Sequence, residues 1–116
     1  MVGESYEKMA GKYLEKQGYQ ILRYNFRCRT GEIDIIAQKA ETIIFCEVKY
    51  RRNNSKGHPF EAITTKKQRT IANCALYYLS VEKIRDMNVR FDVIGILGTK
   101  IEWLQNAFDF QLNTGR

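Results

Sequence analysis

The order of helical and strand-like patterns along the chain predicts an α/β fold, an αβββαβ mixed sheet flanked by helices. The first observation is helical periodicity near the start, and the second is a run of three strand-like segments joined by short turns. The third is a long helical segment followed by a strongly strand-like one. Because a helix between two strands lets the second strand join in parallel, we expect one parallel pair in the sheet.

The first half of the chain predicts one helix and three strands. Apolar residues within 6–17 recur at the spacing of an amphipathic helix, and Gly18 follows as a stop signal. Residue composition and turn signals predict strands at 19–25, 32–38 and 42–50. Since the connections between these strands are short, we expect an antiparallel meander.

The second half of the chain predicts the crossover helix. Residues 52–59 have loop composition and contain the chain's one proline. A helix is predicted at 65–79, and Thr65 and Gln68 at its start have the spacing of a capping box. The loop composition of residues 52–59 therefore predicts a mobile connection next to the basic strand end.

The C-terminal segments complete the predicted sheet. Residues 90–97 are strongly strand-like, and 98–99 form a turn. A last short strand is predicted at 100–104, before an apolar tail that ends near Phe110. The final long strand is the one that we expect to join in parallel.

Length and composition exclude several classes of protein. At 116 residues the chain is too short for two ordinary domains, so residues 1–116 are expected to form one domain. The hydrophobic fraction of 44% and charged fraction of 28% are typical of a folded soluble domain. No apolar stretch reaches the roughly 18 residues of a membrane span, and no signal peptide opens the chain, so a cytoplasmic location without a membrane partner is expected. Three cysteines without Cys-x-x-Cys spacing argue against zinc or a disulfide framework.

The excess of positive charge is concentrated in residues 49–69. The whole chain carries a net charge of +6, and this segment carries all of it, because its one acid is Glu61 and charges balance elsewhere. The basic residues of the segment are Lys49, Arg51, Arg52, Lys56, Lys66, Lys67 and Arg69. Such a segment is either a phosphate-contacting surface, where each neutralised phosphate releases counterions, or a solvated face that aids solubility.

Two acidic residues in apolar strands are candidate metal ligands. Because side chains alternate along a strand, Glu47 and Lys49 point to one face, and pairing of the predicted strands would bring Asp34 close to Glu47. Two carboxylates 4 Å apart repel by about 4 kcal/mol at an effective dielectric constant of about 20, so they need a proton or a cation between them. Mg²⁺ prefers oxygen ligands together with substrate phosphates. Asp34 and Glu47 are therefore our predicted metal ligands, and metal-assisted phosphodiester hydrolysis is the reaction class they indicate.

Lys49 has several possible roles in that reaction. It can orient the attacking water, help to deprotonate it, or stabilise charge that builds on the phosphoryl oxygens. The alternative is that Glu47 and Lys49 are ordinary solvent-facing residues of a half-buried strand and that Asp34 is a partner in a surface ion pair, which is worth about 0–1 kcal/mol. The apolar surroundings of both acids and the basic segment directly downstream favour the metal site.

The same residues resemble a known nuclease signature. Asp34 followed by Glu47-Val48-Lys49 resembles the PD-(D/E)xK motif of restriction-endonuclease-like nucleases, with Ile33 in the proline position. The further matching motifs are Asn25-Phe26-Arg27, Gly31-Glu32-Ile33-Asp34, Lys67-Gln68 and Arg90-Phe91-Asp92-Val93. Together they make the chain similar, along nearly its whole length, to the bacterial YraN-like family of predicted endonucleases, which is related in fold to archaeal Holliday-junction resolvases.

The resemblance implies a restriction-endonuclease-like fold and assigns residues to roles. It implies that Asp34 and Glu47 bind Mg²⁺ or Mn²⁺, that Lys49 is catalytic, and that Glu7 completes the acidic cluster. Glu7 is also explained as an acid that stabilises the positive end of a helix. Gln68 is expected either to contact the site or the substrate, or to act as part of the capping box.

Two other polar residues have structural explanations. His58 is the lone histidine, in a loop without an evident partner, and an incidental position is favoured over a general base. Asp92 lies near Arg90 in the predicted strand 90–97, where a structural ion pair is favoured.

Two functions are carried forward. The first is a Mg²⁺- or Mn²⁺-dependent endonuclease that acts on DNA, including branched or structured forms, and the second is a nucleic-acid-binding module that works with a partner in recombination, repair or DNA uptake. A homodimer is expected if two strands are cut. The predicted nucleic-acid-binding residues are Arg51, Arg52, Lys56, Lys66, Lys67, Gln68 and Arg69.

Overall fold

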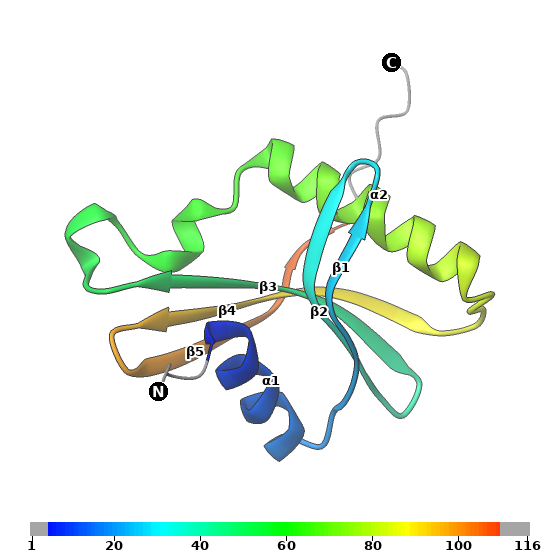
Figure 1. Cartoon of the computed structure of the whole chain (residues 1–116), viewed down its shortest axis with the longest axis horizontal. Coiled ribbons are helices and arrows are strands. Elements are labelled where there is room, and N and C mark those ends of the chain that lie inside the picture. The colour runs from blue at the N-terminus through cyan, green and yellow to red at the C-terminus, as the bar shows by residue number, and fades with distance from the viewer. Residues whose placement is uncertain (1–4, 110–116) are drawn as a thin grey trace.

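Two helices cover opposite faces of a five-stranded sheet (Figure 1). The computed structural model describes residues 5–109. The helices are α1 (Tyr6–Lys16) and α2 (Thr65–Val81), and the strands are β1 (Gln20–Cys28), β2 (Gly31–Lys39), β3 (Thr42–Arg51), β4 (Asn88–Leu97) and β5 (Lys100–Phe108). The predicted α/β class and element order are confirmed, and the arrangement is consistent with a restriction-endonuclease-like fold.

The sheet has the order β1-β2-β3-β4-β5 and is mixed. β3 and β4 pair in parallel from Thr42 opposite Asn88 to Arg51 opposite Leu97, and the other neighbouring pairs are antiparallel. α2 is the crossover that makes the parallel pair possible, as predicted. β5 extends to Phe108, beyond the predicted 104, whereas Phe110 lies outside the described residues.

α1 begins where its sequence predicts. The side chain of Ser5 caps the helix by accepting a hydrogen bond from the Lys8 backbone N–H at 3.2 Å. Gly18 follows the helix with a φ of +93°, a conformation that glycine adopts without strain. The buried face of α1 presents Ala10 and Leu14 to the sheet. The cluster on that face also contains Ile35, Ala37, Ile44, Cys46, Val48, Ile94 and Ile96.

α2 begins at Thr65, as predicted, but its capping residue differs from the prediction by one position. Thr64, and not Thr65, is the cap: it is extended, and its side chain accepts a hydrogen bond from the Lys67 N–H at 3.1 Å. Gln68 Nε2 donates to the carbonyl oxygen of Ile63 at 3.4 Å. The sequence does not distinguish two adjacent threonines, because either hydroxyl can cap a helix. The connection before α2 contains two short 3₁₀ helices, Asn54–Lys56 and Pro59–Ala62.

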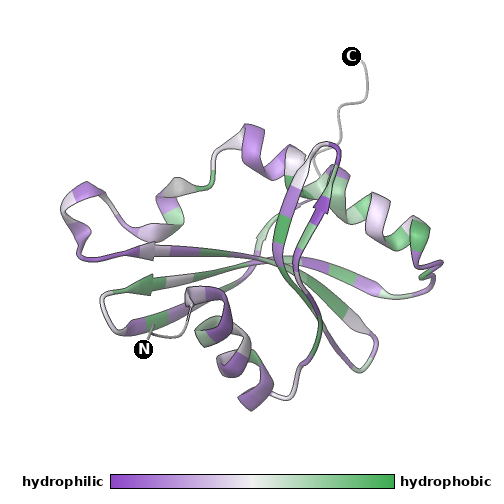
Figure 2. Cartoon of the chain, in the orientation of Figure 1, coloured by the Kyte–Doolittle hydropathy of each residue, from purple (hydrophilic) through white to green (hydrophobic). Residues whose placement is uncertain are grey.

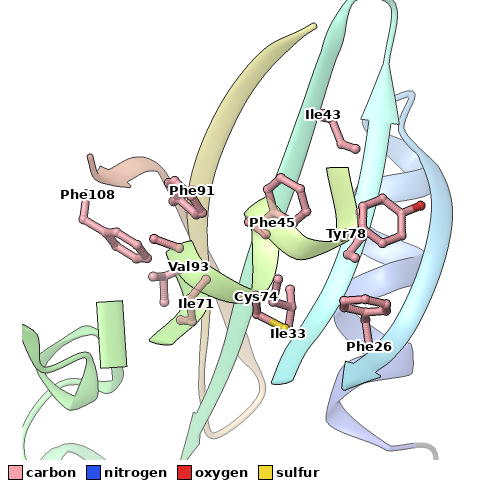
Figure 3. Packing of buried hydrophobic residues seen from close by; sticks show 13 residues of the cluster. Phe26, Ile33, Ile43, Phe45, Ile71, Cys74, Tyr78, Phe91, Val93 and Phe108 are labelled. Atoms are coloured by element: carbon pink, nitrogen blue, oxygen red, sulfur yellow. The ribbon is translucent and has the colours of Figure 1, made fainter. Parts of the chain in front are cut away.

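The core under α2 is the larger of the two and is rich in aromatic rings (Figure 3). Phe45 of β3 and Phe91 of β4 are at the centre, with ring centroids 5.8 Å apart. Tyr78 of α2 packs edge-on against Phe45 at 6.0 Å. Full burial of a side chain of this size stabilises the fold by about 1.5–3 kcal/mol. Figure 2 shows that the central strands, which lie between the two helices, are rich in hydrophobic residues. Because β3 contributes side chains to both core clusters, it is packed on both of its faces.

Asp92 joins β4 to β5 from a fully buried position. The guanidinium of Arg90 donates to both carboxylate oxygens of Asp92, at 2.9 and 2.8 Å. Two groups of β5 also donate to this carboxylate: Trp103 Nε1 at 2.8 Å and the backbone N–H of Asn106 at 2.9 Å. Asn106 has a φ of +53°, next to an irregularity in the β4–β5 register. The structural ion pair predicted for Asp92 and Arg90 is therefore present.

The β1–β2 hairpin bends at Asn25, which has a φ of +51°. Tyr24 and its partner Ile35 pack on the α1 side, whereas the next facing pair, Phe26 and Ile33, packs on the α2 side. Strict alternation would put both pairs on one face of the sheet, so the bend moves the hairpin tip across to α2. Asparagine tolerates this left-handed conformation better than most residues.

Candidate active site

Asp34 lies where β2 separates from β3. Backbone pairing of these strands runs from Lys39 opposite Thr42 to Ile35 opposite Cys46 and stops there. Beyond that point, Asp34 Oδ2 accepts a hydrogen bond from the backbone N–H of Val48 at 2.8 Å. A carboxylate therefore satisfies a backbone group that has lost its partner on β2. The bend at Asn25 in β1 and the separation of β2 from β3 at Asp34 occur at the same level of the sheet and belong to one irregularity.

Glu47 is a buried acid beside Asp34, with only 3% of its side chain exposed. Its Oε2 atom is 3.1 Å from Lys49 Nζ and 3.5 Å from Lys67 Nζ. Its Oε1 atom is buried and has no hydrogen-bond partner. A buried oxygen without a partner costs about 1–3 kcal/mol, and more when charged. The site therefore has an unfilled requirement for positive charge or a donor at Oε1.

The two carboxyls interact strongly. Burial, repulsion from Glu47 and a hydrogen bond with the Glu47 side chain raise the pKa of Asp34 to about 7, although the N–H of Val48 opposes this rise. The structure thus brings together the two acids that the strand pattern placed on one face. Burial and repulsion therefore favour a proton on Asp34 when no cation is bound.

Glu7 approaches this pair from α1. It is in the first turn of the helix and is partly exposed. Its negative charge contributes to the raised pKa of Asp34, so it lies within electrostatic reach. Within residues 5–109, no three His, Cys, Asp or Glu side chains are grouped so as to hold a metal ion. The candidate ligand set is therefore the pair Asp34 and Glu47, and the helix-end explanation of Glu7 stays open.

The residues of the pair fit a hard divalent cation. Both offer carboxylate oxygens, which Mg²⁺ and Mn²⁺ prefer. Glu47 Oε1 has no competing partner, and the repulsion that raises the pKa of Asp34 is the kind that a cation removes. The donor set would be Asp34 and Glu47, with other positions left for water or a phosphate.

The predicted nucleic-acid-binding residues follow one another around the end of the sheet next to the acids. They run from the end of β3, through the 3₁₀ helices, into the first turns of α2 (Figure 1). Arg52, Lys56, Lys66 and Arg69 are exposed. A pocket of about 340 Å³ is lined by Arg51, Arg52, Asn53, Ser55 and Lys56.

Arg51 and Gln68 are placed differently from each other. Arg51 Nη1 donates to the carbonyl oxygen of Tyr50 at 3.2 Å, and its buried Nε has no partner. Gln68 Nε2 donates to the carbonyl oxygen of Ile63, a structural contact that differs from the predicted capping box, in which the Gln68 side chain would accept from a backbone N–H. Arg51 therefore keeps a donor for a ligand, whereas Gln68 uses one of its own at the helix start.

Comparison with known proteins gives the family. A family model described as "Uncharacterised protein family UPF0102" matches residues 6–96, which include both acids and Lys49. The chain belongs to the UPF0102 family. A UPF0102 protein of Lachnoclostridium phytofermentans is 51% identical over 108 residues, covering 92% of each chain. A UPF0102 protein of Syntrophus aciditrophicus is 44% identical over 111 residues, covering 92% of this chain and 87% of the relative.

His58 has partners in this UPF0102 chain that the sequence did not reveal. Its Nε2 is 2.9 Å from Glu102 Oε1, and its Nδ1 accepts a hydrogen bond from the Phe60 N–H at 3.2 Å. The expectation of a loop histidine without a partner is therefore wrong. Because Nδ1 is an acceptor, Nε2 carries the proton that is donated to Glu102. His58 caps the second 3₁₀ helix and ties it to β5.

The contact of Lys67 with Glu47 is a site feature that the sequence interpretation missed. Lys67 was expected only on the basic surface. Helical spacing could have predicted this contact. One face of α2 presents Lys67, Ile71, Cys74 and Tyr78, and the last three of these residues are buried. A lysine at the start of a buried stripe points toward the sheet, where Glu47 needs a cation.

Proposed function

We propose that this UPF0102 protein is a Mg²⁺- or Mn²⁺-dependent endonuclease that hydrolyses phosphodiester bonds of DNA, including branched or structured DNA. The observation that carries the proposal is the buried Glu47, paired with Asp34 at a gap in the sheet, with an oxygen that no protein group satisfies. The resemblance of Asp34, Glu47 and Lys49 to the PD-(D/E)xK motif supports the same reaction. The basic segment beside the acids supports a phosphate-rich substrate.

In this proposal Asp34 and Glu47 hold the cation. A bound Mg²⁺ or Mn²⁺ supplies Lewis acidity toward the phosphodiester and lowers the cost of making water nucleophilic. Asp34 keeps its hydrogen bond from Val48, which fixes the direction of its carboxylate. Asp34 must be deprotonated to bind a cation. Because its pKa is raised to about 7, activity should increase as the pH rises through that value.

Lys49 and Lys67 supply the protein's own positive charge. Both ammonium groups lie on the Oε2 side of Glu47, and Lys49 is 27% exposed, so it can reach a substrate. Next to a phosphodiester, the ammonium group of Lys49 stabilises charge that develops on phosphoryl oxygens and orients the attacking water. Lys67 holds the Glu47 carboxylate in place from the opposite element, α2.

The basic segment provides the contacts to the DNA backbone. The pocket at Arg51 lies two residues along β3 from Lys49, on the same strand face. Arginine binds phosphate through several N–H donors, and Arg51 Nε is a buried donor without a partner. The guanidinium of Arg51, which lines this pocket, would bind a phosphate next to the scissile one. Phosphate contacts position DNA without reading its sequence.

Cleavage assays test the proposal. Duplex, single-stranded, flap and four-way DNA are incubated with the protein and Mg²⁺ or Mn²⁺, with and without chelator. We expect metal-dependent cleavage that Asp34→Asn and Glu47→Gln abolish, and that Lys49→Ala lowers by about 10²- to 10³-fold, the usual effect of losing one donor that stabilises the transition state. Glu41→Gln, at an exposed turn, and Lys100→Ala, at the exposed start of β5, are the matched controls and should keep full activity. Cleavage that is unchanged in Asp34→Asn would come from a contaminating nuclease and would overturn the proposal.

The second candidate function is a non-catalytic nucleic-acid-binding module that acts with a partner. The observation that favours it is that Lys49 and Lys67 already neutralise Glu47 without a cation. Calorimetry separates the two functions: heat of Mn²⁺ binding that disappears in Glu47→Gln supports the enzyme. Tight DNA binding without any Mn²⁺ binding, in the presence of DNA as well, supports the module.

A further inference from the structure

Two thiols meet at the turn between β1 and β2. Cys28 ends β1 and is paired with Gly31 of β2. Its Sγ is 3.2 Å from the hydroxyl oxygen of Thr30. Cys74 comes from the middle of α2, and its Sγ is 3.7 Å from the carbonyl oxygen of the same Gly31. Residues 46 positions apart in the chain are therefore brought to one turn.

The two thiols differ in their access to solvent. Cys28 is partly exposed and borders a pocket of about 430 Å³. The other residues that line this pocket are Arg29, Thr30, Asn73 and Tyr77. Cys74 is fully buried in the core under α2, where Figure 3 shows it beside Ile33. A small molecule in the pocket can reach Cys28, and Cys74 stands behind it.

The surroundings also shift the pKa values of the two thiols in opposite directions. Burial disfavours ionisation of Cys28, but hydrogen bonds from Cys74, from the side chain and backbone of Thr30 and from the backbone of Gly31 outweigh it and lower the Cys28 pKa. Burial, its hydrogen bond with Cys28 and the negative charges of Cys28 and Glu32 raise the pKa of Cys74 to about 12. Cys28 is thus the thiol that ionises more readily, while the S–H of Cys74 donates to the carbonyl oxygen of Gly31. A thiolate is the nucleophilic form of cysteine.

We propose that Cys28 and Cys74 form a redox pair, in which a peroxide oxidises Cys28 through the pocket and Cys74 then closes a reversible disulfide. The inference rests on the convergence of both sulfurs at the Thr30-Gly31 turn and on the pocket that opens onto one of them. It does not depend on the proposed nuclease function.

The chemistry uses one peroxide for each pair. The Cys28 thiolate attacks a peroxide oxygen, an S–O bond forms, the O–O bond breaks, and with hydrogen peroxide the products are a sulfenic acid and hydroxide. The sulfur of Cys74 then attacks the sulfur of Cys28, the S–S bond forms, and the S–O bond breaks. The departing hydroxide leaves as water with the proton of Cys74. Two thiols lose two electrons in total, and the peroxide accepts both.

The disulfide would join two elements that already touch. At Gly31 a side chain would overlap the methyl group of Thr70 on α2, so the turn and the helix are packed without a spacer. Closing the bond therefore ties the tip of the β1–β2 hairpin to α2 in its present position. The oxidised protein should resist denaturation more than the reduced one, because the cross-link restricts the unfolded chain.

Cys46 provides an internal control. It is fully buried on the α1 side of the sheet, in the other core cluster. Burial and the nearby carboxylates of Asp92, Asp34 and Glu47 hold its pKa well above the ordinary value. It should stay reduced under conditions that oxidise the pair.

The test is thiol mapping of the native full-length chain. The protein is treated with one equivalent of hydrogen peroxide, remaining thiols are alkylated in denaturant, and peptides are identified by mass spectrometry. We expect one intramolecular Cys28–Cys74 cross-link, an alkylated Cys46, and full reversal by dithiothreitol. A peroxide-treated wild type with all three cysteines alkylated, or with Cys28 joined to Cys28 of another molecule instead, would overturn the proposal.

Single substitutions assign the order of the two steps. In Cys74→Ser, dimedone should trap a sulfenic acid at Cys28, whereas in Cys28→Ser neither remaining cysteine should react with peroxide at a comparable rate. Equal peroxide reactivity of Cys74 in Cys28→Ser would show that Cys28 is not the first thiol to react. The mapping of the wild type decides the proposal even if the Cys74 variant does not fold.

Discussion

At the scale of single residues, Asp34 is both a structural and a chemical group. One of its oxygens replaces a missing backbone partner of Val48, and burial together with the nearby charge of Glu47 raises the pKa of its carboxyl to about 7. The metal-free pair is held by one proton and by two lysines on Glu47. The charge state of Asp34 therefore links stability, pH and cation binding.

The raised pKa of Asp34 predicts a pH-dependent stability in the metal-free protein. In EDTA, Asp34 of the folded state keeps its proton up to about pH 7, because its pKa is raised to about that value. In the unfolded state the same carboxyl loses its proton near its ordinary pKa of 3.8. The stabilisation by this proton is complete below the lower value and is lost as pH rises through the upper one. Urea unfolding should show the free energy of unfolding falling over this interval, and Asp34→Asn should remove this contribution. Glu41→Gln should keep the wild-type profile, and an unchanged profile in Asp34→Asn would contradict the assignment.

At the scale of secondary structure elements, two irregularities position the site. The left-handed Asn25 turns the hairpin tip toward α2 and separates β2 from β3 where Asp34 lies. The buried Asp92 holds the irregular end of β5 against β4 through its bonds to Arg90, Trp103 and Asn106. Both depart from a regular sheet, and each is stabilised by a polar side chain.

The bend at Asn25 can be tested by substitution. Asn25→Val forces a β-branched residue into a left-handed conformation and should lower the free energy of unfolding by about 1–2 kcal/mol. It should also displace Asp34 and weaken Mn²⁺ binding. Asn25→Gly is the matched control, because glycine accepts this φ, and it should keep near wild-type stability and binding in denaturation and calorimetry. Equal losses in both variants would show that the asparagine side chain, and not the backbone conformation, is required.

The buried Asp92 should be among the most sensitive positions for stability. Asp92→Ala leaves the guanidinium of Arg90 without its partner, which costs about 3–5 kcal/mol when one member of a buried pair is removed. Asp109→Ala, at an exposed position, should change stability by less than about 0.5 kcal/mol. Chemical denaturation measures both. A loss in Asp92→Ala no larger than that in Asp109→Ala would contradict this structural role of Asp92.

At the scale of the whole molecule, the charge and the acids are arranged together. Neither helix within residues 5–109 has the length and apolar character that crossing a membrane needs. The segment that carries the net positive charge begins on β3 at Lys49, next to Glu47, and continues to the start of α2. In the proposed function, this positive charge would attract a negatively charged polymer toward the two carboxylates.

The basic segment predicts a strong salt dependence of DNA binding. Lys66→Ala and Arg69→Ala should each weaken binding and reduce the magnitude of the slope of log K against log salt by about 0.9, the value for one lost phosphate contact on B-DNA. Lys16→Ala, on the exposed side of α1, should leave the slope unchanged. Fluorescence anisotropy across a salt series measures these slopes. If the slope decreased by the same amount in all three variants, the salt dependence would reflect the net charge of the protein and not a defined DNA-binding surface.

Much of the fold and part of the site follow from local patterns. Strand alternation was sufficient to place Glu47 with Lys49, and helical periodicity marks Lys67 as inward-facing. The bend at Asn25 depends on a φ angle that the sequence does not specify, and the contact of His58 with Glu102 joins residues 44 positions apart. Such long-range contacts are decided by packing of the whole sheet, which local patterns do not encode.

The central claim is that Asp34 and Glu47 hold a divalent cation. A crystal soaked with Mn²⁺ and measured at the manganese absorption edge tests it most directly. We expect an anomalous peak between the two carboxylates, about 2.1 Å from an oxygen of each. Well-ordered Asp34 and Glu47 without a peak between them, and with the ammonium group of Lys49 or Lys67 occupying that position instead, would contradict it.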